Sequence, residues 1–233
     1  MRLVLFGAPG VGKGTYANLL SAKYGIPHVS TGEIIRDEVE RQSPLGLAVA
    51  ELMARGHLVS DDIAVALVKE RFKRGDCAKG FVLDGFPRTV PQARAFDEFL
   101  SEHHWKVDFV ANIRVNNSEI VDRISKRYTC RKCHAIYNTE YAPPRREGFC
   151  DNCGGPLYKR SDEDEHAVRT RLNVYMHETA PVLDYYKTQG VVLDMDGTGK
   201  GVEDNFSSLL KLIQSHHEGQ KKLTNGNGNN SPL

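Results

Sequence analysis

Short apolar runs alternate with amphipathic stretches along most of this chain. The apolar runs, each read as a buried strand, cover residues 2–6, 80–84, 107–115 and 191–194. The stretches between them repeat apolar residues at helical spacing, over residues 15–24, 61–74, 91–100, 118–127 and 164–186. Fully apolar strands that alternate with helices are typical of a parallel sheet covered on both faces. The pattern therefore predicts an α/β fold.

Two segments interrupt this alternation and are expected to be inserts. Residues 30–59 are mostly helical in pattern without a buried strand, and residues 126–163 are poor in aliphatic side chains and rich in turn residues. From residue 216 the chain is polar, which predicts a disordered tail over 216–233. The core domain is then expected to consist of residues 1–29, 60–125 and 164–215.

Composition and charge exclude several classes of protein. The chain has 233 residues, of which 40% are hydrophobic and 26% charged, as in ordinary globular proteins. Its 31 basic and 30 acidic residues give a net charge of +1, without the basic excess usual for nucleic-acid binding. We find neither an apolar run long enough to span a membrane nor a signal-peptide pattern, so we expect a cytoplasmic protein.

The first predicted strand ends in a glycine-rich loop that opens the first predicted helix. This loop reads Gly7-Ala8-Pro9-Gly10-Val11-Gly12-Lys13-Gly14-Thr15. Its glycines allow successive backbone N–H groups to face one anion, and the helix N-terminus adds partial positive charge. We expect Lys13 to reach the β- and γ-phosphates of a nucleotide. Gly14 stands where most phosphate loops have a hydroxyl residue, a variant that resembles the nucleoside monophosphate kinases.

A second group of polar residues follows the next buried strand. Asp84-Gly85-Phe86-Pro87-Arg88 comes directly after that strand, and ligands of parallel sheets bind beyond the carboxyl ends of the strands. Asp84 is suited to hold Mg²⁺ through its waters. Arg88 is suited to clamp a phosphate, because guanidinium groups contact phosphate oxygens in pairs. We expect both residues beside the glycine-rich loop.

Together with further residues, these motifs resemble adenylate kinase in identity, order and spacing over about residues 1 to 215. The additional matching residues are Ser30-Thr31-Gly32-Glu33, Arg36, Gln92, Arg123, Arg127, Arg160 and Arg171. The resemblance implies a P-loop NTPase-like core, with residues 30–59 as a lid over AMP and residues 126–163 as a lid over ATP. We call these two segments the AMP-lid segment and the metal-lid segment.

The resemblance also implies roles for individual residues. It implies contacts with ATP by Gly10, Gly12, Lys13, Gly14, Thr15, Arg123, Arg127 and Tyr137. It implies contacts with AMP by Thr31, Arg36, Val59, Gly85, Arg88, Gln92, Arg160 and Arg171. The residues that it assigns to catalysis are Lys13, Arg88, Arg127, Arg160, Arg171 and Asp162. Tyr137 fits simple packing equally well.

One position departs from the family pattern. Two consecutive aspartates usually follow the residue after Arg160, whereas this chain has Asp162 and then Glu163. The carboxylate is retained with one additional methylene. Asp162 is therefore the firmer functional candidate of the pair.

Four of the five cysteines form two Cys-x-x-Cys pairs. Cys130 and Cys133 are separated from Cys150 and Cys153 by sixteen residues, a spacing typical of zinc ribbons. Four thiolates complete a closed tetrahedral site, which is structural rather than catalytic. We expect Zn²⁺, with iron or cobalt as possible substitutes. Four cysteines leave no position for His134, and the remaining Cys77 has no predicted role.

The resemblance implies the reversible reaction Mg·ATP + AMP ⇌ 2 ADP, by direct transfer without a covalent intermediate, in a monomer that binds no nucleic acid or membrane. A GTP-using AMP kinase and a UMP/CMP kinase remain alternatives within the class. Gln92 favours AMP, because its amide presents both a donor and an acceptor to a base, and the long lid disfavours the UMP/CMP enzymes. A zinc-ribbon ATPase that binds nucleic acid is the alternative from another class.

Overall fold

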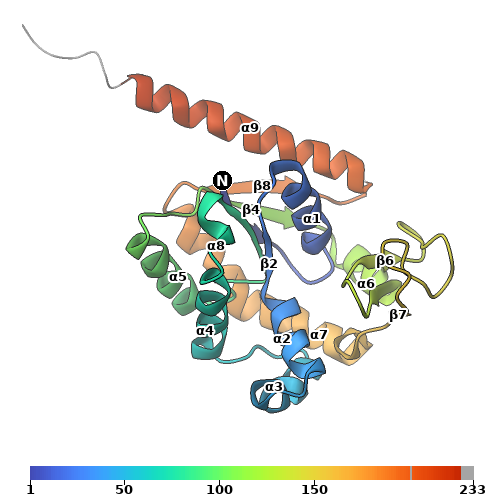
Figure 1. Cartoon of the computed structure of the whole chain (residues 1–233). Helices are drawn as coiled ribbons and strands as arrows, with labels where there is room; N and C mark the ends of the chain where they lie inside the picture. The colour runs from blue at the N-terminus through green and yellow to red at the C-terminus, as the bar shows by residue number, and fades with distance from the viewer. Residues whose placement is uncertain (200, 227–233) are drawn as a thin grey trace, which may run out of the picture. The chain divides into compact units, whose positions relative to one another are not determined.

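The computed structural model describes residues 1–199 and 201–226, without the side chains of 217 and 219–226, and divides into two compact units, Met1–Thr198 and Gly199–Leu233. In the first unit, the described residues form a parallel five-stranded sheet in the order β2-β3-β1-β4-β8 (Figure 1). Its strands are β1 Arg2–Phe6, β2 His28–Ser30, β3 Phe81–Asp84, β4 Phe109–Arg114 and β8 Val192–Asp196. The predicted α/β fold is confirmed.

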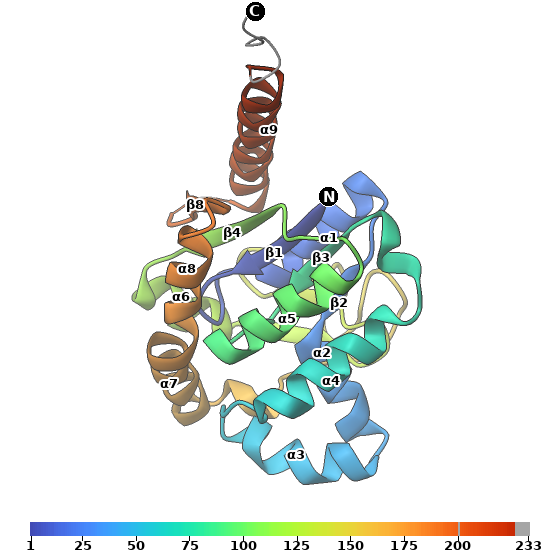
Figure 2. The ribbon, with the colours of Figure 1, turned by 90° about the vertical axis from the view of Figure 1, so that its left-hand side faces the viewer.

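Helices flank this sheet. They are α1 Lys13–Tyr24, α4 Asp61–Phe72, α5 Val90–Glu102, α6 Asn117–Ser125, α7 Glu165–Val174 and α8 Ala180–Lys187, with a short 3-10 helix at Asp76–Lys79. Figure 2 shows α5 lying across the face of the strands. On this face, Val4 and Leu83 pack with Phe96 and Tyr186 in one buried cluster. Neighbours such as Leu3 in β1 point to the opposite face and are equally buried, which explains why the strands read as unbroken apolar runs.

The AMP-lid segment contains α2 Thr31–Glu40 and α3 Pro44–Ala54. Ser30 caps α2 by accepting from the Glu33 N–H, and Ser43 caps α3 by accepting from the Gly46 N–H. In Figure 2, α3 lies beyond α4 on the side away from the sheet. Apolar residues of this segment join the main buried cluster of the sheet.

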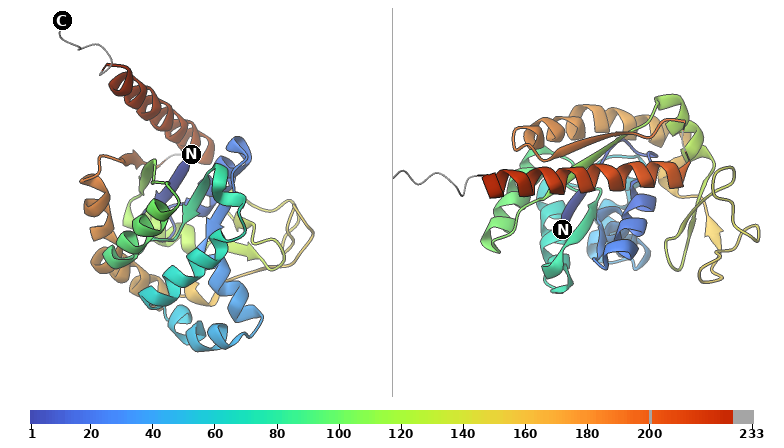
Figure 3. Two further views of the ribbon diagram at one scale, coloured as in Figure 1. Left: turned by 60° about the vertical axis from the view of Figure 1, so that its left-hand side comes forward. Right: turned by 90° about the horizontal axis from the view of Figure 1, so that it is seen from above.

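The metal-lid segment forms a second, antiparallel sheet in the order β6-β5-β7 among the described residues. Its strands are β5 Arg127–Cys130, β6 Ile136–Asn138 and β7 Leu157–Tyr158, and a short 3-10 helix follows at Ser161–Glu163. Seen from above in Figure 3, this yellow-green segment stands apart from the parallel sheet. A three-stranded sheet this small buries little apolar surface.

The single helix predicted over residues 164–186 is interrupted in the structure. A π-helical stretch, Tyr175–Thr179, separates α7 from α8. Pro181 stands at the start of α8 and has no N–H to donate to the preceding turn. The local change in hydrogen bonding therefore has a cause in the sequence.

In the second unit, α9 spans Val202–Gly226. This corrects the expected disorder from residue 216 over 216–226, which continue the helix. The stretch after His216 contains Glu, Gln and Lys, which have high helix propensity, and extending a helix adds one hydrogen bond per residue. Residues 227–233, the rest of the predicted tail, lie outside the described residues.

Candidate active site

The glycine-rich loop joins β1 to α1, where the sequence predicted it. Gly12 precedes α1 with a φ of 98°, and no side chain caps the first turn of the helix. The N–H groups of that turn, which begins with Lys13, Gly14 and Thr15, are therefore directed at the loop. A Cβ atom on Gly7 would lie 2.4 Å from the Ile113 carbonyl oxygen, so the loop must begin with glycine.

Lys13 lies folded over the loop that it terminates. Its ammonium group donates to the carbonyl oxygens of Gly7 at 2.8 Å and Ala8 at 2.9 Å. Burial lowers the pKa of Lys13 to about 8, an effect that Asp84 opposes and that Arg88 and other arginines reinforce. An anion that binds beside Lys13 would therefore stabilise its buried positive charge.

Asp84 ends β3 directly opposite Leu5 of β1, beside the loop as predicted. Burial would raise the pKa of this carboxyl group, but His28, Lys13 and Arg88 hold it below its usual value. His28 Nε2 lies 3.8 Å from Asp84 Oδ2, a contact that sequence reasoning missed. A Cβ atom on Gly14 would lie 3.6 Å from the same oxygen, so the carboxylate faces the start of α1.

Four of the predicted AMP-contact residues, Thr31, Gly85, Arg88 and Gln92, meet at the start of α5. Arg88 Nε and the Thr31 hydroxyl both donate to the Gly85 carbonyl oxygen at 2.7 Å. Gln92 is 2% exposed, and its side-chain oxygen accepts from the Arg88 N–H at 2.8 Å. Residues from the AMP-lid segment and from the core therefore share one hydrogen-bonded group.

Asp61 completes this group and was not singled out from the sequence. Its Oδ1 accepts from Gln92 Nε2 at 2.8 Å and from the Thr89 hydroxyl at 2.9 Å. In sequence, Asp61 reads only as an acidic residue in the first turn of α4. Together with Val59, which is 9% exposed, it lines a cleft of about 690 Å³ between α3, α4 and α7.

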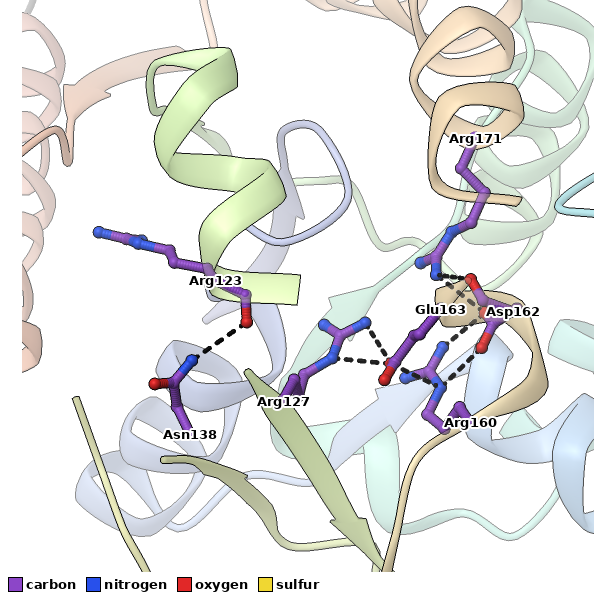
Figure 4. A network of polar contacts seen from close by, with 7 residues as sticks. All are labelled: Arg123, Arg127, Asn138, Arg160, Asp162, Glu163 and Arg171. Carbon is purple, nitrogen blue, oxygen red and sulfur yellow. Dashed lines mark hydrogen bonds and ion pairs between the residues drawn. The ribbon is translucent and has the colours of Figure 1, made fainter. Parts of the chain in front are cut away.

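Three predicted arginines converge on two carboxylates (Figure 4). Asp162 accepts from Arg160 Nη2 at 2.7 Å and from Arg171 Nη1 at 2.9 Å. Glu163 Oε1 lies 2.5 Å from Arg127 Nη2 and 3.2 Å from Arg160 Nε. The arginines come from β5, from the end of the metal-lid segment and from α7, and the cluster carries one positive charge in excess.

The electrostatics of this cluster favour a further anion. Burial lowers the pKa of Arg171 to about 9 and that of Arg36 to about 10, and repulsion from Arg160 adds to both effects. Burial would also raise the pKa of Asp162, but Arg171 and Arg160 hold it far below its usual value. Buried cations near one another are stabilised by a shared polyanion such as a phosphate chain.

Glu163, the departure from the family pattern, is as much a part of the cluster as Asp162. Its side chain is 2% exposed, and it contacts two arginines where a residue one methylene shorter has less reach. Its second oxygen, Oε2, is buried without a hydrogen-bond partner. Sequence comparison within the motif identified the substitution but not this contact.

Arg123 and Tyr137, the residues expected near the ATP base, make other contacts here. Arg123 pairs with Glu119 and donates weakly to the Gly197 carbonyl oxygen at 3.4 Å. The Tyr137 hydroxyl accepts from the Asp151 N–H at 2.7 Å and lies 3.4 Å from Cys150 Sγ. Their predicted contacts with ATP stay predictions.

The four cysteines predicted as metal ligands come together in the metal-lid segment. The Sγ atoms of Cys130, Cys133, Cys150 and Cys153 lie within 4.8 Å of one another, with close pairs at 3.4 and 3.5 Å. Four sulfurs around a tetrahedral Zn²⁺, at about 2.3 Å each, stand roughly 3.8 Å apart. The cluster therefore fits a metal ion of this kind.

Among the residues that the structure describes, no helix combines the length and the apolar character that crossing a bilayer requires.

Comparison with known proteins identifies a family to which this chain is similar. The sequence profile of the adenylate kinase family matches residues 5–191. An adenylate kinase of Archaeoglobus fulgidus is 47% identical over 217 residues, which cover 92% of this chain and 100% of the relative. Those of Carboxydothermus hydrogenoformans and Methanocella arvoryzae are 47% identical over 214 residues and 48% identical over 197 residues. These alignments cover 92% and 84% of this chain, and 100% and 91% of the relatives.

Proposed function

The chain belongs to the adenylate kinase family, and on that premise we propose which of its residues carry out the reversible reaction Mg·ATP + AMP ⇌ 2 ADP. The observation that carries the proposal is the convergence of Arg127, Arg160 and Arg171 beside Lys13 and Asp84. This is a set of buried cations with too few carboxylates to neutralise it. Phosphoryl transfer requires such a set, because negative charge spreads over the transferring oxygens.

On the donor side, we propose that the loop and the first turn of α1 bind the phosphates of ATP. Gly10, Gly12, Gly14 and Thr15 present backbone N–H groups, and Lys13 reaches the β- and γ-phosphates. Lys13 already contacts two carbonyl oxygens of the loop, so its ammonium group is positioned before the nucleotide arrives. Arg123 and Tyr137 would contact the base.

On the acceptor side, we propose that AMP binds between the AMP-lid segment and the start of α5. Arg88 and Arg36 would hold the AMP phosphate, while Thr31, Val59, Gly85 and Gln92 would surround the nucleoside. The proposed role of Gln92 is supported by two hydrogen bonds, to Arg88 and to Asp61, which fix the oxygen and the nitrogen of its amide. A side chain held in this way selects a base by fixed donor and acceptor positions.

The transfer itself needs positioning more than proton chemistry. The attacking AMP phosphate is already an anion, so no general base is required and no covalent intermediate forms. Arg127, Arg160 and Arg171 would exchange part of their contact with Asp162 and Glu163 for phosphate oxygens as charge moves between the nucleotides. A single arginine directed at that charge contributes about 10³- to 10⁵-fold in related reactions.

Mg²⁺ that accompanies ATP would be held at Asp84. The carboxylate is ionised, buried and directed at the start of α1, which is the environment that a hydrated magnesium ion requires. Bound there, the ion supplies charge neutralisation to the β- and γ-phosphates. Asp84 would orient its waters and so fix the position of the phosphate chain against Lys13.

We propose that residues 30–59 and 126–163 move as lids over AMP and ATP, with residues 1–29, 60–125 and 164–215 as the core. Closure would exclude water from the transferring group, which prevents simple hydrolysis of ATP. Arginines from the metal-lid segment take part in the buried cluster, so closing this segment completes the site.

We propose that the four cysteines hold a structural Zn²⁺, with iron or cobalt as possible substitutes. The four Sγ atoms lie within 4.8 Å of one another, as the ligands of one tetrahedral ion would. Beyond the site, we propose a cytoplasmic monomer without nucleic-acid partners. The near-neutral net charge of +1 supports this view.

A nucleotide panel tests the proposed acceptor and reaction together. ADP formation from Mg·ATP would be measured with AMP, CMP, UMP or GMP offered separately, and GTP would replace ATP in a parallel series. We expect turnover with AMP and ATP alone. Turnover with CMP or UMP would overturn the role of Gln92, and preference for GTP would change the donor. Absence of transfer from a folded, metal-loaded protein would contradict the assignment of the arginine cluster.

A further inference from the structure

The two cysteine knuckles of the metal-lid segment have the same backbone turn but different residues at one position. The His134 N–H donates to the Cys130 carbonyl oxygen at 3.1 Å, and the Gly154 N–H donates to the Cys150 carbonyl oxygen at 2.9 Å. Both residues have positive φ, 56° for His134 and 67° for Gly154. The knuckle turn therefore requires the left-handed conformation at the residue after its second cysteine.

Glycine is the residue that adopts this conformation without strain, and the second knuckle uses it. His134 in the first knuckle adopts it at a cost in free energy. The turn alone does not explain the histidine, because glycine satisfies the same hydrogen bond twenty residues further along the chain. A strained non-glycine residue often has a side chain with a functional contact.

The imidazole of His134 contacts the AMP-lid segment. Its Nε2 lies 3.2 Å from Oδ1 of Asp37, which belongs to α2, and the two side chains are 23% and 37% exposed. His134 Nδ1 is buried and has no hydrogen-bond partner, so the contact with Asp37 is the polar interaction that holds the ring. This pair joins two segments that are separate inserts in the chain.

The contact between His134 and Asp37 lies close to proposed active-site residues of both segments. Arg36, the neighbour of Asp37 on α2, interacts electrostatically with Arg160 and Asp162 at the end of the metal-lid segment. Fixing α2 against the first knuckle therefore fixes Arg36 relative to the arginine cluster. A shift of about 1 Å in such an arrangement is enough to weaken a phosphate clamp.

We propose that His134 and Asp37 are positioning residues that dock the metal-lid segment onto the AMP-lid segment when both close. The inference rests on the proposed assignment of these segments as lids. The histidine strains the knuckle in every state of the protein, whereas its contact with Asp37 forms only when the lids meet. The residue thus weakens the metal lid slightly and strengthens the closed complex.

A double-mutant cycle tests the contact in the full, metal-loaded chain. The variants are Asp37→Ala, His134→Asn, which retains a residue tolerant of the left-handed conformation, and the double variant. A partly exposed pair of this kind predicts a two- to fivefold rise in KM for AMP in each single variant, with kcat changed less than twofold. The double variant should show no larger rise than either single one. Independent, multiplying effects, or an unchanged KM in Asp37→Ala, would overturn the proposal.

Two glycine-position variants separate docking from a purely structural role. His134→Gly removes the strain and the contact together, so it should release metal to a chelator more slowly while raising KM for AMP as His134→Asn does. Gly154→His is the matched control, since a side chain at Gly154 would meet no neighbour within 4 Å; it should release metal faster without changing KM. If His134→Gly released metal faster and also raised KM, the histidine would be a structural residue and the proposal would fail.

The wild-type chain measured in parallel keeps this inference distinct from the proposed function. If the wild type fails to transfer phosphate to AMP, the proposed function is wrong, and KM values have no meaning for the contact. If the wild type is active and the cycle shows no coupling, only the docking role of His134 and Asp37 is wrong.

Discussion

The AMP-lid segment and the metal-lid segment, which we propose cover the same site, differ in the residues that form their buried centres. In the AMP-lid segment, Ile35, Val49 and Val59 are buried and belong to the main apolar cluster of the sheet. In the metal-lid segment, the buried cluster consists of Cys130, Tyr137 and Cys150, with Leu157 packed against it. The AMP-lid segment is therefore packed as an extension of the core, whereas cysteine side chains form the centre of the metal-lid segment.

If the two segments move as proposed, this difference explains how each of them can stay folded. Each fully buried aliphatic side chain contributes about 1.5–3 kcal/mol, so the AMP-lid segment gains from every residue that it packs against the core. Its fold is tied to that contact. The proposed metal site would stabilise the metal-lid segment from within, independently of contact with the core. With the metal bound, we expect the metal-lid segment to move as a unit without losing its own structure.

Loss of the metal should have the largest effect and should be confined to one lid. A structural Zn²⁺ contributes on the order of 10 kcal/mol to the folding of small domains, and this segment has few apolar contacts to replace it. We expect a chelator, or Cys130→Ser, to unfold the metal-lid segment and lower its melting temperature. Because Arg127 and Arg160 belong to this segment, kcat should fall with it. Calorimetry of metal-loaded and metal-free protein measures this. An unchanged melting temperature would contradict a structural metal.

Matched arginines, one from each lid, should separate the chemical roles of the two covers. Arg160→Ala should lower kcat by about 10³-fold, because Arg160 belongs to the cluster expected to meet the transferring group. Arg36→Ala should mainly raise KM for AMP, by roughly 10- to 100-fold, because it would lose a phosphate contact. Steady-state kinetics with varied AMP distinguishes the two. Equal losses of kcat in both variants would contradict this division.

Lys13 belongs to neither lid and should respond to pH. It is protonated below about pH 10.5 in the unfolded chain but only below about pH 8 in the folded one. Below pH 8 both states carry the charge, and its burial destabilises the fold in full. The penalty falls as pH rises from 8 to 10.5, because the unfolded chain then holds more protons.

Lys13→Met should therefore stabilise the unliganded protein, by on the order of 1–3 kcal/mol at pH 7, while abolishing ATP binding. The gain should shrink toward pH 10.5. Denaturant unfolding of both proteins between pH 7 and 10.5 measures the difference, and a gain independent of pH would show that Lys13 is not the group responsible.

Apolar trimming should have the smallest effect and should distinguish the lids again. Ile35→Val removes one buried methylene from the AMP-lid segment and should cost about 0.5–1.5 kcal/mol. Leu157→Val is the matched change in the metal-lid segment, where Leu157 is only partly buried and the metal holds the fold, so we expect a smaller loss. Urea unfolding of metal-loaded protein compares the two. A larger loss of unfolding free energy in Leu157→Val would mean that apolar burial stabilises the metal-lid segment more than the metal site does.

Much of the fold could be predicted because its signals are local. The four longer strands and most helices of the core appear as apolar runs and helical periodicity. β2, His28–Ser30, was missed because three residues with one fully buried side chain leave no pattern. The interruption between α7 and α8 was missed because helical periodicity continues through it, although Pro181 marked the place.

The site was predictable where motifs are contiguous and not where distant segments meet. Sequence spacing alone predicts roles for the glycine-rich loop, Arg88 and the cysteine pairs. Asp61 beneath Gln92, and Asp37 beside His134, are pairs that only the folded chain brings together. No local pattern relates residues about 30 or 100 positions apart, so these contacts had to be found in the structure.

Hydrogen exchange of the two lids, with and without a chelator, tests the central contrast most directly. Backbone amides of residues 30–59 and 126–163 would be followed in the same unliganded sample. We predict that chelation removes protection throughout the metal-lid segment and leaves protection of the AMP-lid segment unchanged. Protection lost equally in both lids, or retained in both, would contradict the view that burial holds one cover and metal the other.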